Sequence, residues 1–123
     1  MPKISILPGT KGLVQETGNV VTAESIALSP LQTIANSTTI RTASRLIARV
    51  DCAGGNRTGV IMAQGSVDGQ ICIVLNTGGE TITMAAAGTS NVATGTACVI
   101  GASSVALFVY DATIGDWHAL LDT

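Results

Sequence analysis

Apolar and polar residues alternate along the chain with a period of two from Arg45 onward. The alternation in residues 44–52 sorts the side chains into one face of Leu46, Ala48, Val50 and Cys52 and a second face of Arg45, Ile47, Arg49 and Asp51. Successive side chains of a strand point to opposite faces, so this segment is predicted to be a half-buried strand. A helix would place Arg41, Arg45 and Arg49 on one stripe, but the Ala-Gly-Gly that follows favours the strand.

Six further runs of strand character follow, each separated from the next by turn residues. They cover residues 58–63, 70–75, 81–84, 97–101, 103–110 and 116–121. Asp68-Gly69 is a favoured turn, because this pair tolerates positive φ and suits the twist of neighbouring strands. Regular turns and the lack of a convincing helical pattern predict an all-β domain, with residues 103–121 as a terminal hairpin. We expect an antiparallel β-sandwich of jelly-roll type, or a small barrel.

The first 42 residues have a different pattern of apolar residues. Short apolar pieces at residues 4–7, 19–21 and 25–28 alternate with glycine and proline, and each piece is short for an independent element. This pattern predicts an extended N-terminal arm with edge strands over residues 1–42, leaning on a β-sandwich domain over residues 43–123.

Composition adds that part of the surface is expected to be covered. Of the 123 residues, 46% are hydrophobic and 11% are charged, against about 25% charged residues in an ordinary soluble domain. A chain with so few charges is expected to bury part of its outside against copies of itself or a partner. The net charge of −2 argues against nucleic acid as a partner. The longest apolar stretch, residues 98–110, is interrupted and too short to span a membrane.

Candidate chemistry is sparse. Cys52, Cys72 and Cys98 are odd in number and far apart, which predicts small core residues in a reducing cytoplasm and neither a disulfide framework nor a metal site. His118 would share a strand face with Asp116, so an ion pair can form, but no Gly-x-Ser-x-Gly elbow accompanies them. We therefore expect no enzyme activity and no cofactor.

A calcium site in the predicted terminal hairpin is the remaining metal hypothesis. Asp111, Thr113 and Asp116 offer oxygen ligands around Gly115. Two carboxylates in a six-residue loop are a weak signal beside the patterned ligands of a dedicated calcium loop. A plain hairpin loop explains these residues better, so no metal ligand is assigned.

Residues 68–121 resemble small β-domains of bacteriophage virion proteins, which occur on tail fibres, tailspikes and capsid decorations. The resemblance rests on short motifs: DGQ at 68–70, NTG at 76–78, TIT at 81–83, GTSNV at 88–92, FVYD at 108–111, and Trp117 in the closing strand. This chain has no repetitive shaft and no enzymatic β-helix, which favours a capsid decoration protein over a fibre. Fold-level likeness does not decide between these roles.

The resemblance implies a non-enzymatic cement protein that binds between major capsid protein subunits and stabilises the phage head. Its partners would be other copies of itself, as a homotrimer, and the major capsid protein, on virions assembled in the host bacterial cytoplasm. The alternative is a receptor- or glycan-binding module of a tail or head fibre. An arm of Lys3, Ile4, Ile6, Leu7 and Lys11 is expected to contact the capsid by pairing with a sheet edge. The three aromatic residues, Phe108, Tyr110 and Trp117, are expected to fill the core or a subunit interface.

Overall fold

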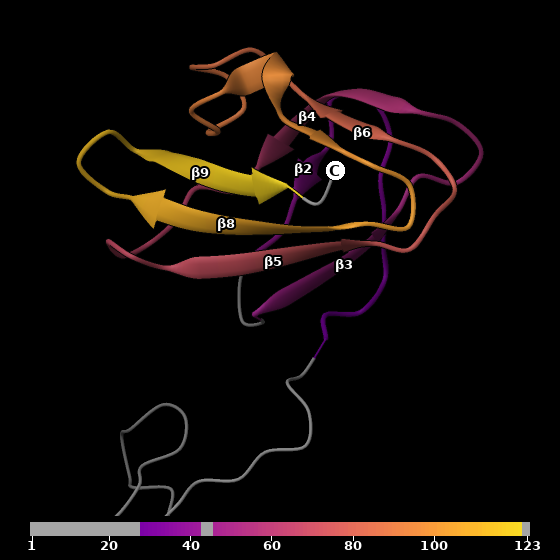
Figure 1. The fold of residues 1–123 in the computed structure, drawn as a ribbon, viewed down its shortest axis with the longest axis horizontal. Helices are drawn as coiled ribbons and strands as arrows, with labels where there is room; N and C mark the ends of the chain where they lie inside the picture. Colours follow the sequence, from indigo (N-terminus) through magenta and orange to yellow (C-terminus); the bar gives the residue numbers. More distant parts are fainter. Residues whose placement is uncertain (1–27, 43–45, 122–123) are drawn as a thin grey trace, which may run out of the picture.

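The computed structural model describes residues 28–42 and 46–121, which form two β-sheets with a hydrophobic core between them (Figure 1). The five-stranded sheet has the order β1 (Gln32–Thr33), β3 (Ile47–Asp51), β5 (Ile71–Asn76), β8 (Val105–Asp111) and β9 (Asp116–Leu121). The four-stranded sheet has the order β2 (Thr39–Ile40), β4 (Arg57–Met62), β6 (Ile82–Met84) and β7 (Val99–Ile100). A single 3-10 turn, η1 (Gly95–Ala97), lies between β6 and β7.

Consecutive strands from β1 to β6 alternate between the two sheets. As a result β1, β3 and β5 are parallel neighbours in one sheet, and β2, β4 and β6 are parallel neighbours in the other. Parallel neighbours need a crossover connection, and here the strand of the opposite sheet supplies it. The chain thus makes three turns of a flattened coil, which the antiparallel strands β7, β8 and β9 complete.

The predicted all-β, two-sheet architecture is confirmed, but the prediction of a purely antiparallel sandwich is wrong. Four of the seven strand pairings are parallel, which also excludes a jelly roll, since that fold is built of antiparallel strands. A barrel is wrong as well, because the described strands form two separate sheets with open edges. The physical reason is that period-two alternation reports which face a strand buries and says nothing of its neighbour's direction.

The individual strands lie close to where the hydrophobic pattern predicts them. Residues 47–51 are a strand and not a helix, with Ala48, Val50 and Cys52 turned into the core. The terminal hairpin of β8 and β9 forms as predicted, with Tyr110 opposite Trp117 and Asp111 opposite Asp116. Asp68-Gly69 is a turn, with Gly69 at φ +77°, but it lies on the connection from β4 to β5 and so leads from one sheet to the other.

Trp117 and its neighbours hold the two sheets together. The indole ring is fully buried, lies edge-on to Phe108 at a centroid distance of 6.4 Å, and lies 5.1 Å from the ring of Tyr110. Its Nε1 donates a 2.9 Å hydrogen bond to the carbonyl of Ala63, just after β4. This hydrogen bond links β9 of the five-stranded sheet to the residue that follows β4 of the four-stranded sheet. It also gives the buried indole N–H an acceptor.

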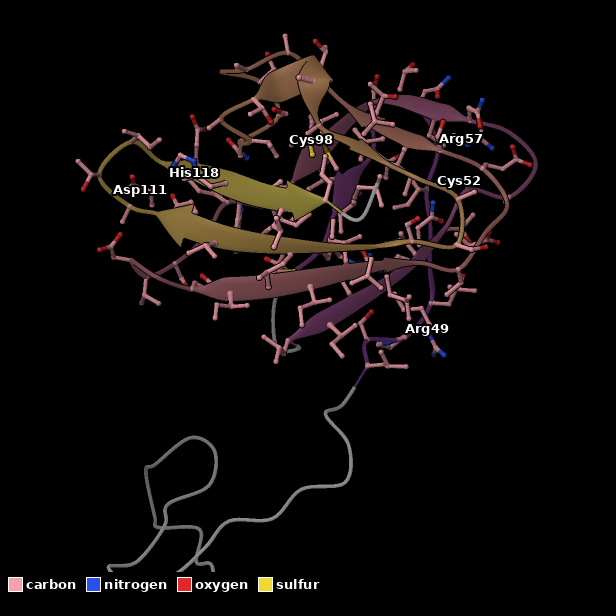
Figure 2. The ribbon with its side chains drawn as sticks, in the orientation of Figure 1. Arg49, Cys52, Arg57, Cys98, Asp111 and His118 are labelled. Carbon is pink, nitrogen blue, oxygen red and sulfur yellow. The ribbon has the colours of Figure 1, made fainter. Side chains whose placement is uncertain are left out.

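Arg57, at the other end of the molecule, makes a second set of hydrogen bonds between separate segments of the chain (Figure 2). Its Nε donates to the carbonyls of Ile34 at 3.0 Å and Cys52 at 2.8 Å, and its Nη2 donates to the carbonyl of Ala53 at 2.9 Å. Charged donors make stronger hydrogen bonds than neutral ones. One side chain therefore holds two successive turns of the coil in register.

The two-sheet unit extends into the region predicted to be an arm with edge strands. Leu28 forms a parallel bridge with Ile47, and β1 and β2 pair with β3 and β4. Residues 1–27 lie outside the described residues, and with them the five arm residues Lys3, Ile4, Ile6, Leu7 and Lys11. Within the described part of the chain, no helix is long and apolar enough to cross a membrane.

Candidate interaction surface

The outer face of the five-stranded sheet carries a continuous patch of aliphatic side chains. Strand register aligns Ile47, Ile73, Leu107 and Leu120 in one row across four strands. A second row pairs Leu75 with Val105, and a third pairs Ile71 with Val109. We call these eight residues the aliphatic patch: Ile47, Ile71, Ile73, Leu75, Val105, Leu107, Val109 and Leu120.

The described residues leave this patch open to solvent. Four of its members are exposed, from 39% for Val109 to 69% for Leu120, and the other four are half-buried between their neighbours. Leu28 extends the central row by one more residue through its bridge to Ile47. Single exposed aliphatic residues are ordinary, whereas a contiguous group of this kind marks a contact surface.

The patch exists because β5 and β8 are apolar at almost every position. Their sequences, ICIVLN and VALFVYD, send Cys72, Val74, Ala106 and Phe108 into the core and still place Ile, Leu and Val on the outside. Strands that are apolar on both faces are typical of sheets covered on both sides. The sequence signal was therefore the loss of alternation in these two runs, which our sequence analysis did not use.

Charged groups flank the patch at opposite ends of the sheet (Figure 2). Arg49 lies on β3 in the row of Leu75 and Val105, and Asp111 and Asp116 face each other at the turn end of β8 and β9. The Nε of Arg49 is buried and has no hydrogen-bond partner among the described residues. Asp51 follows Arg49 on the same face of β3, one step beyond the patch.

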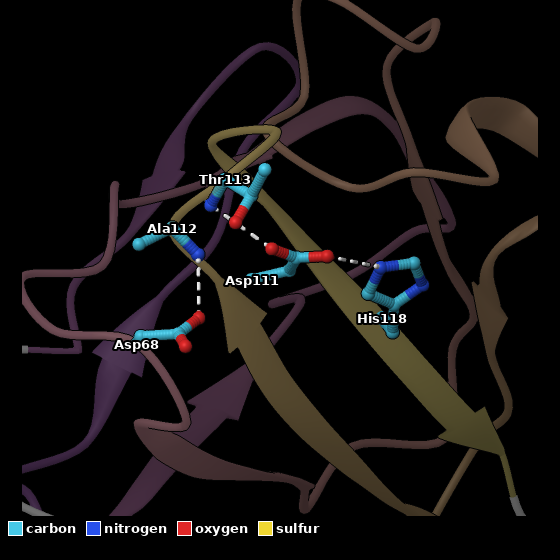
Figure 3. A network of polar contacts seen from close by, with 5 residues as sticks. All are labelled: Asp68, Asp111, Ala112, Thr113 and His118. Carbon is cyan, nitrogen blue, oxygen red and sulfur yellow. Dashed lines mark hydrogen bonds and ion pairs between the residues drawn. The ribbon is translucent and has the colours of Figure 1, made fainter.

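The acidic end is organised by the hairpin turn (Figure 3). Asp111 accepts a 2.9 Å hydrogen bond from the backbone N–H of Thr113, and Asp68 accepts one of 3.0 Å from the N–H of Ala112. The other oxygen of Asp111 lies 3.8 Å from Nε2 of His118. These carboxylates thus serve as caps of a turn, which is an ordinary structural role for aspartate.

The predicted pairing of His118 with Asp116 is not the one that forms, since Asp111 across the hairpin takes that position. The imidazole is more than half exposed, and no hydrogen bond of the described residues joins it to a serine. A nucleophilic triad needs that contact. Among residues 28–42 and 46–121, no three His, Cys, Asp or Glu side chains come together in a way that would hold a metal ion.

The three cysteines lie in the core and form no disulfide, in agreement with the prediction. Burial raises the pKa of Cys72 and of Cys98 to about 11. Burial also raises the pKa of Cys52, against the opposing influence of the Arg57 guanidinium. Thiolates are the reactive form of cysteine, so these positions are inert packing residues at neutral pH.

The three aromatic residues all lie in the core of the single chain. Phe108 and Trp117 are fully buried and Tyr110 is 5% exposed. Their side chains lie on the inner face of β8 and β9, while the outward positions of the same strands carry part of the aliphatic patch.

Comparisons with protein-family models, with curated proteins and with solved structures gave no match. The candidate surface is therefore defined by its own geometry: an aliphatic area on a sheet, with Arg49 and Asp51 at one end and Asp111 and Asp116 at the other. Such a surface can hold a protein partner by excluding water.

Proposed function

We propose that this chain is a structural, non-enzymatic virion protein of a tailed bacteriophage, a capsid decoration or cement protein that binds between major capsid protein subunits. The observation that carries the proposal is the aliphatic patch on the five-stranded sheet. A protein that holds a particle together needs dry, shape-matched contacts on a rigid scaffold. The low charge content and the phage-like motifs of residues 68–121 support the same reading.

The sheet edges supply the second kind of contact that such a protein uses. The strand β9 is the last strand of the five-stranded sheet, and among the hydrogen bonds of residues 28–42 and 46–121 only its start at Trp117 bonds to a further segment, residues 91–93. An extended arm of a neighbouring copy, such as residues 3–7, can add a strand along such an edge. In this proposal the arm and the patch together join copies to each other and to the capsid.

The alternative of a glycan-binding module loses support from the position of the aromatic residues. Sugar-binding sites commonly stack a ring against the sugar, and the rings of Phe108, Tyr110 and Trp117 are all in the core. A fibre module that binds a protein receptor through the aliphatic patch remains the second candidate, because that surface would serve it equally well.

The decisive experiment mixes the purified full chain with mature, DNA-free capsids of the phage that carries its gene, and follows co-sedimentation. We expect saturable binding and a higher temperature of capsid disruption. A chain that stays in the supernatant while binding host cells would overturn the cement function and favour the receptor module.

A further inference from the structure

We infer that the aliphatic patch is covered by the same patch of a second copy of this chain, related to the first by a two-fold axis. The inference names the self-contact that the proposed function uses. Its test needs no capsid, so failure of capsid binding and failure of this contact are separate results.

The charges around the patch are self-complementary, which is the observation that selects a second copy as the occupant. Arg49 lies at one corner, on β3, and Asp111 with Asp116 lies at the diagonally opposite corner, on β8 and β9 (Figure 2). When two copies pack face to face about a two-fold axis that lies in the plane between them, perpendicular to the line joining these two corners, the corners exchange. Each Arg49 then meets the carboxylates of the other copy, and the contact forms twice.

Arg49 also has a polar atom that the described residues leave unpartnered. Its Nε is buried, and a buried donor without an acceptor is unfavourable. Arginine is well suited to bind a carboxylate through two parallel hydrogen bonds. In the proposed pair, a carboxylate of the second copy binds the outer nitrogens of this guanidinium, while its Nε stays buried within its own chain.

The opposite charges at the two ends of the patch also make a partner of uniform charge unfavourable. A strongly acidic or strongly basic protein would bring like charges against one of the two ends of the patch, which weakens association. A copy of the same face brings Arg49 to the carboxylates of the other copy, with Asp51 one step beyond it, and its apolar rows present Ile, Leu and Val to Ile, Leu and Val.

The first test is the absolute mass of the purified full chain in solution, measured by light scattering after size-exclusion chromatography. We expect twice the 12.4 kDa of one chain, or an assembly built of such pairs. A trimer, as the resemblance implies, would require a head-to-tail contact and would overturn the two-fold arrangement. A monomer would overturn the inference too, and would leave residues 1–27 or a different protein as the cover.

The second test compares the same substitution on the two outer faces. Leu120→Lys places a charge in the patch at the edge strand β9, and the control Val99→Lys places one on β7, the edge strand of the other sheet, where Val99 is 40% exposed. We expect Leu120→Lys to be monomeric and Val99→Lys to keep the wild-type mass. Circular dichroism checks that both variants are folded. Equal loss of association in both variants would contradict the inference.

The third test exchanges the charges. Arg49→Glu is expected to raise the dissociation constant of the pair by about tenfold or more, because two like-charge contacts replace two ion pairs. The double variant Arg49→Glu/Asp116→Arg restores opposite charges across the two-fold axis, so we expect it to recover most of that loss. A double variant as weak as Arg49→Glu alone would exclude the proposed pairing of corners.

Discussion

The two sheets share one core but differ on their outer faces. Outside the core, the four-stranded sheet mixes Thr39 and Thr83 with Ile61 and Val99, whereas the five-stranded sheet groups eight aliphatic side chains together, with charged residues at their ends. Threonine keeps the β-branched shape that a strand favours while remaining compatible with water. In our proposal, the outer face of the four-stranded sheet stays in contact with solvent and the outer face of the five-stranded sheet makes the protein contact.

The size of the strands follows the same division. In the five-stranded sheet β5, β8 and β9 have six or seven residues each, whereas in the four-stranded sheet β4 has six and β2, β6 and β7 have two or three. Long paired strands make a broad, rigid platform, which reduces the entropy lost when a partner binds. The aliphatic patch thus lies on the sheet that has more of the long strands, and the core beneath both faces can be tested separately from either surface.

The largest effect on stability is expected from Trp117→Ala, which removes the ring packing and the hydrogen bond that join the two sheets. The substitution leaves a large cavity beside Phe108 and an unpaired carbonyl at Ala63, and we expect the free energy of unfolding to fall by about 3–5 kcal/mol. Urea unfolding followed by circular dichroism measures the change. A loss below about 1 kcal/mol would show that the sheets hold together without this contact.

Next in size is Asn76→Ala, at the end of β5. The fully buried amide of Asn76 donates to the carbonyls of Glu80 at 2.7 Å and Gly101 at 2.9 Å, which lie on connections to both sheets. Two part-buried carbonyls would lose their donor and the buried amide would be removed, so we expect a loss of about 2–4 kcal/mol by urea unfolding. The control Thr39→Ala, on the outer face of the four-stranded sheet, should stay within about 0.5 kcal/mol.

Gly65→Ala tests the connection that crosses from the four-stranded to the five-stranded sheet. A Cβ at Gly65 would collide with the ring of Tyr110, so we expect a loss of about 1–3 kcal/mol as the ring moves. Gly79→Ala is the matched control, because a Cβ there meets nothing within 4 Å. Thermal unfolding of the two variants should separate them clearly, and equal melting temperatures would contradict the close packing at Tyr110.

The smallest effect on the free energy of unfolding at neutral pH comes from the cysteine thiols. They report whether solvent is excluded equally from the core on the side of each sheet. Because the pKa of Cys72 and Cys98 is raised to about 11 in the folded state, the neutral thiol is favoured by folding. This contribution to stability is complete below about pH 9, the ordinary pKa, and is lost as the pH rises to 11. Urea unfolding at several pH values measures the decline.

Thiol labelling at pH 8 gives the complementary measurement. We expect no labelling of the folded protein and three thiols labelled per chain in denaturant. Rapid labelling of one cysteine in the folded protein would show that the core is open at that sheet. The variant Cys72→Ala/Cys98→Ala should lose most of the decline in stability between pH 9 and pH 11.

Much of the local structure could be predicted from the sequence, because local patterning produces it. The alternation around Ala48 and Val50 predicted a strand with the correct buried face, and the run from residue 103 to residue 121 predicted the hairpin. The direction of the parallel strands could not be predicted in this way, since the corner at Asp68-Gly69 has the same residues whether the chain turns back or crosses to the other sheet.

The candidate surface could be predicted from the sequence only in part. Low charge predicted that some surface would be covered, but placing the patch required the register that brings Ile47, Ile73, Leu107 and Leu120 into one row. The partner of His118 shows the same limit. Asp116 is the nearer carboxylate in sequence, and Asp111 becomes the neighbour only through the pairing of β8 with β9.

The sequence by itself determined the all-β class, the inward faces of the strands, the cysteines as small core residues and the shortage of charge, because each of these follows from residue type and local spacing. Only the tertiary structure decided the winding between two sheets, the burial of the three aromatic residues and the grouping of eight aliphatic side chains between opposite charges. Those features depend on contacts between residues far apart in the chain. A surface for assembly is a property of several strands together, so no single run of residues reveals it.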